Sequence, residues 1–365
     1  MPEASSVKTI AVVGAAGFVG RQLLKTMQEA GVQVTAVIRG AAELSVEGSF
    51  HNVLHESQVT ESTAFDLVIN LAYPNSGPLF SYAAQNRLIF AAVERLMKPG
   101  GRLIHVSTQA VFGLALDRPV SATPVREVRD AAYVEAKIET EHHFAALQKK
   151  VGLSLDIVRL GNVWGYASGA WALPLVQRLL TGRPIGVQGV AGLSNSTDVA
   201  NVASYLSHLA IQGEGAPGLR FHHLAEFASV PWSYWIDRLA AELQVSPVHA
   251  GPEQMTLPVS GRAELAEAMA GVKPRALYRR LAGERVSGSW ARSMLTRLPR
   301  PLFVKLKGRE LSPAKAMPLS REDQMFLSIM SARQEFKSQV VAGWTPPVGQ
   351  EESMRRVLGW LRQEW

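Results

Sequence analysis

Two residues able to exchange a proton stand four positions apart in the first half of the chain, in the stretch Tyr133-Val-Glu-Ala-Lys137. The stretch opens a helical pattern, and on an α-helix this spacing puts the phenol and the ammonium group on one face. A neighbouring lysine cation lowers the pKa of a phenol, so that the hydroxyl can exchange a proton with a substrate alcohol or carbonyl near neutral pH. The pair predicts acid/base chemistry at a substrate oxygen.

Three glycines, Gly14, Gly17 and Gly20, occur in the segment GAAGFVG. A short apolar run precedes the segment, and a helical pattern that ends at Gly31 follows it. In such a unit one glycine turns the chain out of the strand, one lets backbone N–H groups approach a pyrophosphate, and one allows the helix to pack closely on the strand. A turn with a purely structural role is the alternative. The context favours a dinucleotide site.

The choice of dinucleotide depends on the end of the next expected strand, VQVTAVIRG. An acidic residue there would bind the ribose 2′-hydroxyl of NAD and repel the 2′-phosphate of NADP. The chain instead reads Val37-Ile38-Arg39, and the donors of a guanidinium group match a phosphate. NADP is therefore the expected cofactor, with NAD as an alternative, and a solvated Arg39 is the alternative without a ligand.

The elements that must position these residues follow from the hydrophobic pattern. Short apolar runs alternate with longer stretches of helical periodicity. Strands that alternate with helices imply right-handed crossovers and a parallel sheet. We expect an α/β fold with a doubly wound parallel Rossmann sheet. Its strands are predicted at 8–13, 32–40, 66–72, 102–107 and 154–160, and its helices at 21–31, 81–98 and 131–150.

Length and pattern predict two lobes, since the chain exceeds the usual size of a single domain. Residues 1–165 are expected to form the Rossmann dinucleotide-binding domain with the catalytic residues. The regular alternation weakens after about residue 165, so residues 166–365 are assigned mainly to a smaller C-terminal substrate-binding lobe. The chain is expected to return to the Rossmann domain near 195–225, and a basic insertion occupies about 255–335.

Taken together, the motifs resemble those of the extended short-chain dehydrogenase/reductase family, the NAD-dependent epimerase/dehydratase-like enzymes. The glycine spacing G-x-x-G-x-x-G is typical of that family. The resemblance covers the first 240 residues and returns near the C-terminus. Its further motifs are VSTQAVFG at 106–113, VRLGNVWG at 158–165, TDVA at 197–200 and the closing segment GWTPPVG at 343–349.

The resemblance implies hydride transfer between a substrate carbon and a nicotinamide. Tyr133 is then the general acid or base, and Lys137 holds the nicotinamide ribose and tunes Tyr133. Thr108, five residues before Gly113, orients the reacting oxygen, and its neighbour Ser107 does not. The implied cofactor-binding residues are Gly14, Ala16, Gly17, Phe18, Val19, Arg39, Leu71, Ala72 and Lys137, and the implied substrate-binding residues are Thr108, Tyr133 and Asn162.

The resemblance also implies a substrate, because Asn162 matches an asparagine that reaches a sugar-nucleotide diphosphate. Asp198 matches an aspartate that helps hold the substrate lobe. A nucleotide-sugar 4-ketoreductase or epimerase is therefore expected. A 4,6-dehydratase is disfavoured, since Thr108-Gln109-Ala110 lacks the acid and base that eliminate water. Reduction of a hydrophobic, steroid- or flavonoid-like ketone and a non-catalytic NADP sensor remain alternatives.

Three asparagine and histidine assignments are less direct. The family often has an aspartate after its third strand that holds the adenine, and residues 50–54 contain no such acid, so this contact is either missing or replaced by His51 or Asn52. Asn86 resembles a structural asparagine of the family, with a solvated side chain as the alternative. The adjacent His142 and His143 point to different faces of a helix, so no metal site is expected.

Composition sets the remaining expectations. The chain has no cysteine, no signal-peptide pattern at its N-terminus and no apolar run of membrane-spanning length, so a cytoplasmic protein is expected. The net charge of +7 is concentrated in 273–309, with eleven lysine or arginine residues and one acidic residue. This segment is either a solvated basic face or a peripheral membrane contact. Nucleic acid is not an expected partner, because no nucleic-acid fold accompanies the charge. The resemblance to the family, whose members often dimerise, implies a homodimer.

Overall fold

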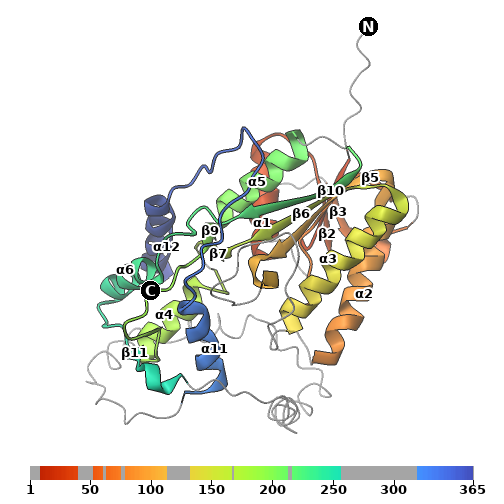
Figure 1. The fold of residues 1–365 in the computed structure, drawn as a ribbon. Coiled ribbons are helices and arrows are strands. Elements are labelled where there is room, and N and C mark those ends of the chain that lie inside the picture. Colours follow the sequence, from red (N-terminus) through yellow and green to blue (C-terminus); the bar gives the residue numbers. More distant parts are fainter. Residues whose placement is uncertain are drawn as a thin grey trace, which may run out of the picture.

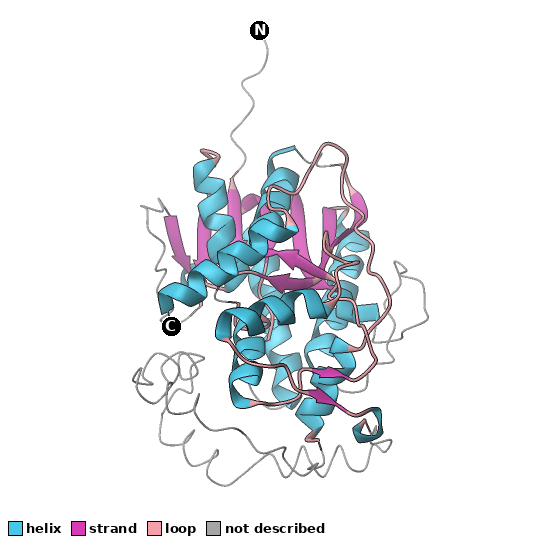
Figure 2. Cartoon of the chain, turned by 90° about the vertical axis from the view of Figure 1, so that its left-hand side faces the viewer, coloured by secondary structure: helices cyan, strands magenta, loops and turns pink. Residues whose placement is uncertain are grey.

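The computed structural model describes most of the chain, and the basic segment 273–309 lies outside the described residues. Two layers of helices enclose a central sheet, and a second lobe made largely of helices lies beyond one end of the sheet strands (Figures 1 and 2). The described residues are 9–39, 52–60, 63–74, 79–112, 132–166, 168–212, 216–255 and 319–364.

The described part of the chain contains a parallel sheet of seven strands in the order β10-β6-β5-β4-β1-β2-β3. Strands β1 and β2 are largely apolar on both faces, as expected for a parallel sheet covered on both sides by helices. The strands are β1 (Ile10–Val13), β2 (Thr35–Ile38), β3 (Asn52–His55), β4 (Phe65–Asn70), β5 (Met97–Thr108), β6 (Ser154–Leu160) and β10 (Gly218–Leu224).

Helices cover both faces of the sheet (Figure 1). α1 (Phe18–Glu29) and α5 (Val199–Gln212) pack on one face, and α2 (Leu79–Leu96) and α3 (Ala132–Val151) pack on the other. Alternate side chains of each strand enter the two cores, so that Val12 contacts the α1 side and Val13 the α2 side. The doubly wound Rossmann sheet is thereby confirmed.

The second lobe, whose helices lie below the sheet in Figure 2, has its own hydrophobic core. Trp164 and Trp235 are fully buried there with ring centroids 4.8 Å apart, so both pack inside the lobe. Its helices are α4 (Ala172–Thr181), α6 (Trp232–Leu243), α11 (Arg321–Met330) and α12 (Gln350–Glu364), and its short strands are β7 (Asn162–Trp164), β8 (Gly186–Val187), β9 (Ser196–Asp198) and β11 (His249–Ala250). Short 3-10 turns are η1 (Glu56–Gln58), η2 (Gln109–Phe112) and η3 (Pro252–Gln254).

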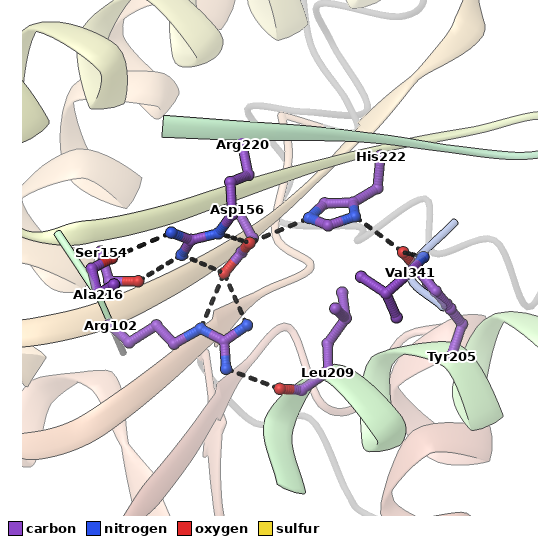
Figure 3. A network of polar contacts seen from close by, with 9 residues as sticks. All are labelled: Arg102, Ser154, Asp156, Tyr205, Leu209, Ala216, Arg220, His222 and Val341. Carbon is purple, nitrogen blue, oxygen red and sulfur yellow. Dashed lines mark hydrogen bonds and ion pairs between the residues drawn. The ribbon is translucent and has the colours of Figure 1, made fainter. Parts of the chain in front are cut away.

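A buried polar network ties the edge strand β10 to the sheet (Figure 3). The carboxylate of Asp156 accepts hydrogen bonds from Arg102 Nε at 2.8 Å, Arg220 Nε at 2.7 Å and His222 Nε2 at 3.0 Å. On the other side of its ring, His222 Nδ1 lies 2.8 Å from the hydroxyl of Tyr205 on α5. These contacts join β5, β6, β10 and α5 at the end of the sheet opposite the carboxyl ends of the strands.

The strand order reverses at β1, which lies between β2 and β4. In open α/β sheets a ligand binds outside the carboxyl ends of the strands at such a reversal. A ligand site is therefore expected at the carboxyl ends of β1, β4 and β5.

None of the helices within the described ranges is long and apolar enough to cross a bilayer.

Candidate active site

The turn after β1, residues 14–20, leaves no room for side chains at two of its glycines. Gly14 has a φ of 82°, and a Cβ atom there would lie 2.9 Å from the backbone nitrogen of Ala72. A Cβ atom at Gly20 would lie 2.5 Å from the carbonyl oxygens of Gly14 and Ala15. Helix α1 begins directly after Gly17, so its free N–H groups face the carboxyl end of β1. The turn fits a dinucleotide phosphate.

The other cofactor-binding residues expected from the sequence lie around this turn. Ala16 and Val19 are half-buried, while Phe18 is exposed at the start of α1. Arg39 is exposed one residue beyond β2, which is the neighbour of β1. Leu71 follows β4 and donates its backbone N–H to Val13 at 2.9 Å. These residues thus lie at or just beyond the carboxyl ends of β1, β2 and β4.

The expectation for the adenine contact is wrong for Asn52. Asn52 starts β3 and pairs with Thr35, at the end of the sheet away from the glycine turn. The residue that follows the carboxyl end of β3 is Glu56, half-buried at the start of η1. A carboxylate is therefore available where the family places an acid, and only the strand register reveals it. His51 lies outside the described residues.

The catalytic residues expected from the sequence come together at the carboxyl end of β5. Thr108 is the last residue of β5, and its side chain is hydrogen-bonded to Tyr133 on α3. Thr108 Oγ1 accepts the N–H of Ala110 at 3.2 Å, which leaves its own proton for the phenol. By contrast, the hydroxyl of Ser107 is buried with no hydrogen-bond partner among the described residues. This geometry suits Thr108 for orienting a reacting oxygen.

Lys137 lies one helical turn after Tyr133 and is buried, with 3% of its surface exposed. Its ammonium group donates a hydrogen bond of 2.8 Å to the carbonyl oxygen of Val106. Burial lowers the pKa of Lys137 to about 8, while the negative charge of Glu141 acts in the opposite direction. The charge of this lysine is therefore sensitive to mildly alkaline pH.

The expected lowering of the Tyr133 pKa by Lys137 is not found. Loss of solvation raises the pKa of Tyr133 to about 12, and the hydrogen bond with Thr108 offsets this only in part. The reason is the direction of the ammonium group, which is bound to the carbonyl of Val106. Tyr133 therefore holds its proton throughout the neutral range.

Tyr73, in the loop after β4, is a site residue that the sequence motifs did not single out. Its ring meets the ring of Tyr133 edge to face, with centroids 5.5 Å apart. The ammonium group of Lys137 lies 5.2 Å from the centre of the same ring. An aromatic residue next to the small Ala72 was the available signal in the sequence.

Asn86 is fully buried in α2, so the solvated alternative is wrong. Its amide donates to the carbonyl of Ala136 at 3.0 Å and to the carboxylate of Glu139 at 2.6 Å. Both partners flank Lys137 on α3. Asn86 therefore fixes the helix that carries Tyr133 and Lys137 against α2.

The residues expected to serve the substrate lie where the chain enters the second lobe. Asn162 opens β7 and donates its amide to the carbonyl of Ser194 at 2.7 Å. Asp198 caps α5 by accepting the N–H of Ala200 at 2.7 Å, and it also accepts the hydroxyl proton of Ser353 on α12. Asp198 thus joins the sheet domain to the last helix of the second lobe.

The histidines make aromatic and polar contacts within the fold. The His143 ring stacks on Phe90 with centroids 3.9 Å apart, and its Nε2 lies 2.6 Å from Glu94. His222 and His223 are buried on the edge strand β10. Within the described residues, no group of three or more histidine or acidic side chains is arranged to hold a metal ion.

The sequence profile of the NAD dependent epimerase/dehydratase family matches residues 10–203. The matched span contains the glycine turn, Thr108, Tyr133 and Lys137. A relative from Stigmatella aurantiaca, 4-hydroxy-2-methyl-3-oxo-4-farnesyl-3,4-dihydroquinoline-1-oxide ketoreductase, is 26% identical over 235 residues, which are 60% of this chain and 68% of the relative.

Solved structures with the same fold include two sugar-nucleotide enzymes. The UDP-glucose 4-epimerase of Thermotoga maritima, solved with UDP-glucose, gives a TM-score of 0.58 at 15% identity over 97% of this chain and 99% of the epimerase. TunA, an NAD-dependent NDP-hexosamine 5,6-dehydratase, gives a TM-score of 0.58 at 20% identity over 98% of each chain. Because the family profile spans more than half of the sequence, the chain belongs to the NAD dependent epimerase/dehydratase family, a family of enzymes within the extended short-chain dehydrogenases/reductases.

Proposed function

We propose that the protein is an NADP-dependent oxidoreductase that transfers hydride at a hydroxyl or keto carbon, with Tyr133 as the proton donor. The carrying observation is the Thr108–Tyr133 hydrogen bond at the carboxyl end of β5, with Lys137 one turn away on α3. A bound nicotinamide would supply the hydride. Because the pKa of Tyr133 is raised to about 12, the phenol is protonated at neutral pH, as reduction of a carbonyl requires.

The preferred substrate class in this proposal is a nucleotide sugar, through a 4-ketoreductase or 4-epimerase reaction. Two observations support a nucleotide-sugar substrate. Asn162 lies at the entrance to the second lobe, and the fold is shared with UDP-glucose 4-epimerase. Gln109 and Ala110 after Thr108 offer no acid or base for a 4,6-dehydration. Epimerisation would use the same three residues but return the nicotinamide to its starting state.

A hydrophobic ketone is the second candidate, carried by exposed aromatic side chains. Phe18, Tyr73 and Tyr166 are 36%, 43% and 46% exposed. Phe18 opens α1, Tyr73 follows β4, and Tyr166 follows β7, which continues directly from β6. All three therefore occur beyond the carboxyl ends of sheet strands. The ketoreductase relative from Stigmatella aurantiaca acts on a compound of this kind by its name.

One panel of assays separates these candidates. Purified protein is incubated in separate reactions with NADPH and nucleotide 4-keto sugars, with NADPH and flat hydrophobic ketones, and with NADP+ and UDP-sugars, while NADPH oxidation and sugar interconversion are both followed. NADPH oxidation with a keto sugar identifies a 4-ketoreductase, and interconversion without net oxidation identifies an epimerase. Oxidation with the ketones alone selects the second candidate. Tight NADPH binding without turnover of any class would support a non-catalytic sensor instead.

Replacing Arg39 with alanine is expected to weaken NADPH binding by about 10- to 100-fold, since a hydrogen bond between charged groups contributes about 1.5–3 kcal/mol. NADH lacks the 2′-phosphate, so its affinity should stay unchanged. Fluorescence titration of both cofactors measures the effect. Arg355→Ala on α12, which removes another exposed arginine, is the matched control. Equal affinity of the parent protein for the two cofactors would contradict the assignment.

The homodimer, the cytoplasmic location and the peripheral membrane contact through 273–309 stay predictions.

A further inference from the structure

Tyr73 contacts both members of the proton-transfer pair. Its ring lies 5.5 Å from the ring of Tyr133 with the planes at 83°, which is an edge-to-face geometry. The ammonium group of Lys137 lies over the ring at 5.2 Å from its centre, within the range of a cation–π interaction. A single aromatic ring thus links the phenol and the cation.

The loop that carries Tyr73 is fixed at the preceding residue, Ala72, which is contacted from one side by Asn70 and from the other by Gly14. Asn70 Oδ1 accepts the N–H of Ala72 at 3.0 Å, and Asn70 Nδ2 lies 3.2 Å from His105 Nδ1. Burial, followed by the charge of Lys137, holds the pKa of His105 well below its usual value, so the neutral ring accepts this bond. Gly14 packs against the backbone of Ala72 from the other side. The position of Tyr73 is therefore set by the sheet and the glycine turn.

We propose that Tyr73 is a positioning residue that holds the Tyr133 ring and the charged Lys137 side chain in register through the face and edge of its own ring. The assignment rests on the proposed function of Tyr133 and Lys137. The ring face attracts the ammonium group and favours its charged form, and the edge-to-face contact restricts rotation of the Tyr133 ring. The hydroxyl of Tyr73 has no part in this role.

Other groups around the pair set the background for a pH-dependent test. Glu141, on the same helix, favours the charged form of Lys137. His105 on β5 is neutral and adds no charge. Thr108 on β5 acts on Tyr133, and Tyr82 on α2 acts on Tyr73. Tyr73 differs from these four groups because its ring contacts both Tyr133 and Lys137.

Two variants separate the ring from the hydroxyl. Tyr73→Phe keeps the aromatic ring, whereas Tyr73→Leu keeps an apolar side chain and removes the aromatic face. In Tyr73→Leu the pKa of Lys137 should fall, so the loss of kcat/KM for NADPH-dependent reduction above about pH 8 should begin about half a pH unit lower. Its kcat at neutral pH should fall about 2- to 10-fold, because the edge-to-face contact is lost. Tyr73→Phe should keep the parent's alkaline midpoint and recover most of the kcat that Tyr73→Leu loses.

A second readout does not require turnover. The pH dependence of NADPH binding, measured by fluorescence in the binary complex, should show the same shift in Tyr73→Leu, because Lys137 is the residue assigned to the nicotinamide ribose. Absence of turnover in the parent would remove the proposed function, yet this titration would still test Tyr73. A Tyr73→Leu midpoint equal to that of the parent, or an equal shift in Tyr73→Phe, would overturn the proposal. Thermal unfolding of both variants shows that they remain folded.

Discussion

Tyr133→Phe should lower kcat for carbonyl reduction by about 10²- to 10⁴-fold, the range for loss of a positioned general acid. The variant keeps the ring that packs against Tyr73 at 5.5 Å and removes only the hydroxyl that pairs with Thr108. The affinity for NADPH should therefore change little. Steady-state kinetics with the substrate identified in the panel and a separate NADPH titration measure the two quantities.

The pH profile adds a sharper check on the same residue. Tyr133 has a pKa of about 12 and Lys137 one of about 8, so the fall in reduction rate above pH 8 is assigned to Lys137. The residual activity of Tyr133→Phe should keep that alkaline limb in the same place. Thr108→Val should show a smaller loss, because it leaves the acid in position. Full activity in Tyr133→Phe would refute the mechanism.

Asp156→Asn should lower the free energy of unfolding by about 3–5 kcal/mol, the usual cost of breaking a buried ion pair from one side. Asp156 is 1% exposed and Arg102 is 7% exposed, so the guanidinium group would remain buried without its counter-charge. Arg220 and His222 would lose the same acceptor. The amide has nearly the volume of the carboxylate, so no cavity contributes. Urea unfolding at pH 7 measures the change.

The matched control is Asp66→Asn, which removes a carboxylate paired with Lys98 at the surface. There the side chains are 37% and 42% exposed, so the loss should be at most about 1 kcal/mol. Equal losses in both variants would show that burial does not decide the effect.

Acid should reduce the difference between the parent and Asp156→Asn. Burial alone would raise the pKa of Asp156, but the hydrogen bonds from His222 and Arg220 and the charge of Arg102 lower it well below 3.8. A carboxyl group with a lowered folded-state pKa stabilises the protein above its unfolded pKa, and this contribution is lost as the pH falls towards the folded-state pKa. The advantage of the parent should thus be complete near neutral pH and shrink below about pH 4.

The sequence predicted the parts of the fold that depend on local pattern. Strands β1, β2, β4, β5 and β6 fall on the expected apolar runs, and α3 on the expected helical stretch. Strand β3 was not predicted, because its four residues are exposed or half-buried and carry no clear apolar run. Helix α2 ends at Leu96, before the predicted 98, since Met97 already pairs with Phe65 in the sheet.

The site shows the same division between local pattern and tertiary contact. The glycine turn and the Tyr133–Lys137 spacing are local features, and sequence was sufficient to place them. The direction of the Lys137 ammonium group depends on the carbonyl of Val106, which only the packing of α3 on β5 brings near. Tyr73 and Glu56 likewise gain their positions from strand pairing, which spacing along the chain does not reveal.

The core of the second lobe draws on residues far apart along the chain, from Trp164 to Leu361. During synthesis, every strand of the central sheet has left the ribosome once Leu224 emerges. The apolar side chains of α4 and α6 lack part of their core until the 15 residues of α12 have also been synthesised. A premature stop within that helix would therefore deprive the lobe of part of its core and leave those side chains open to aggregation, whereas the same loss from an exposed tail would be harmless.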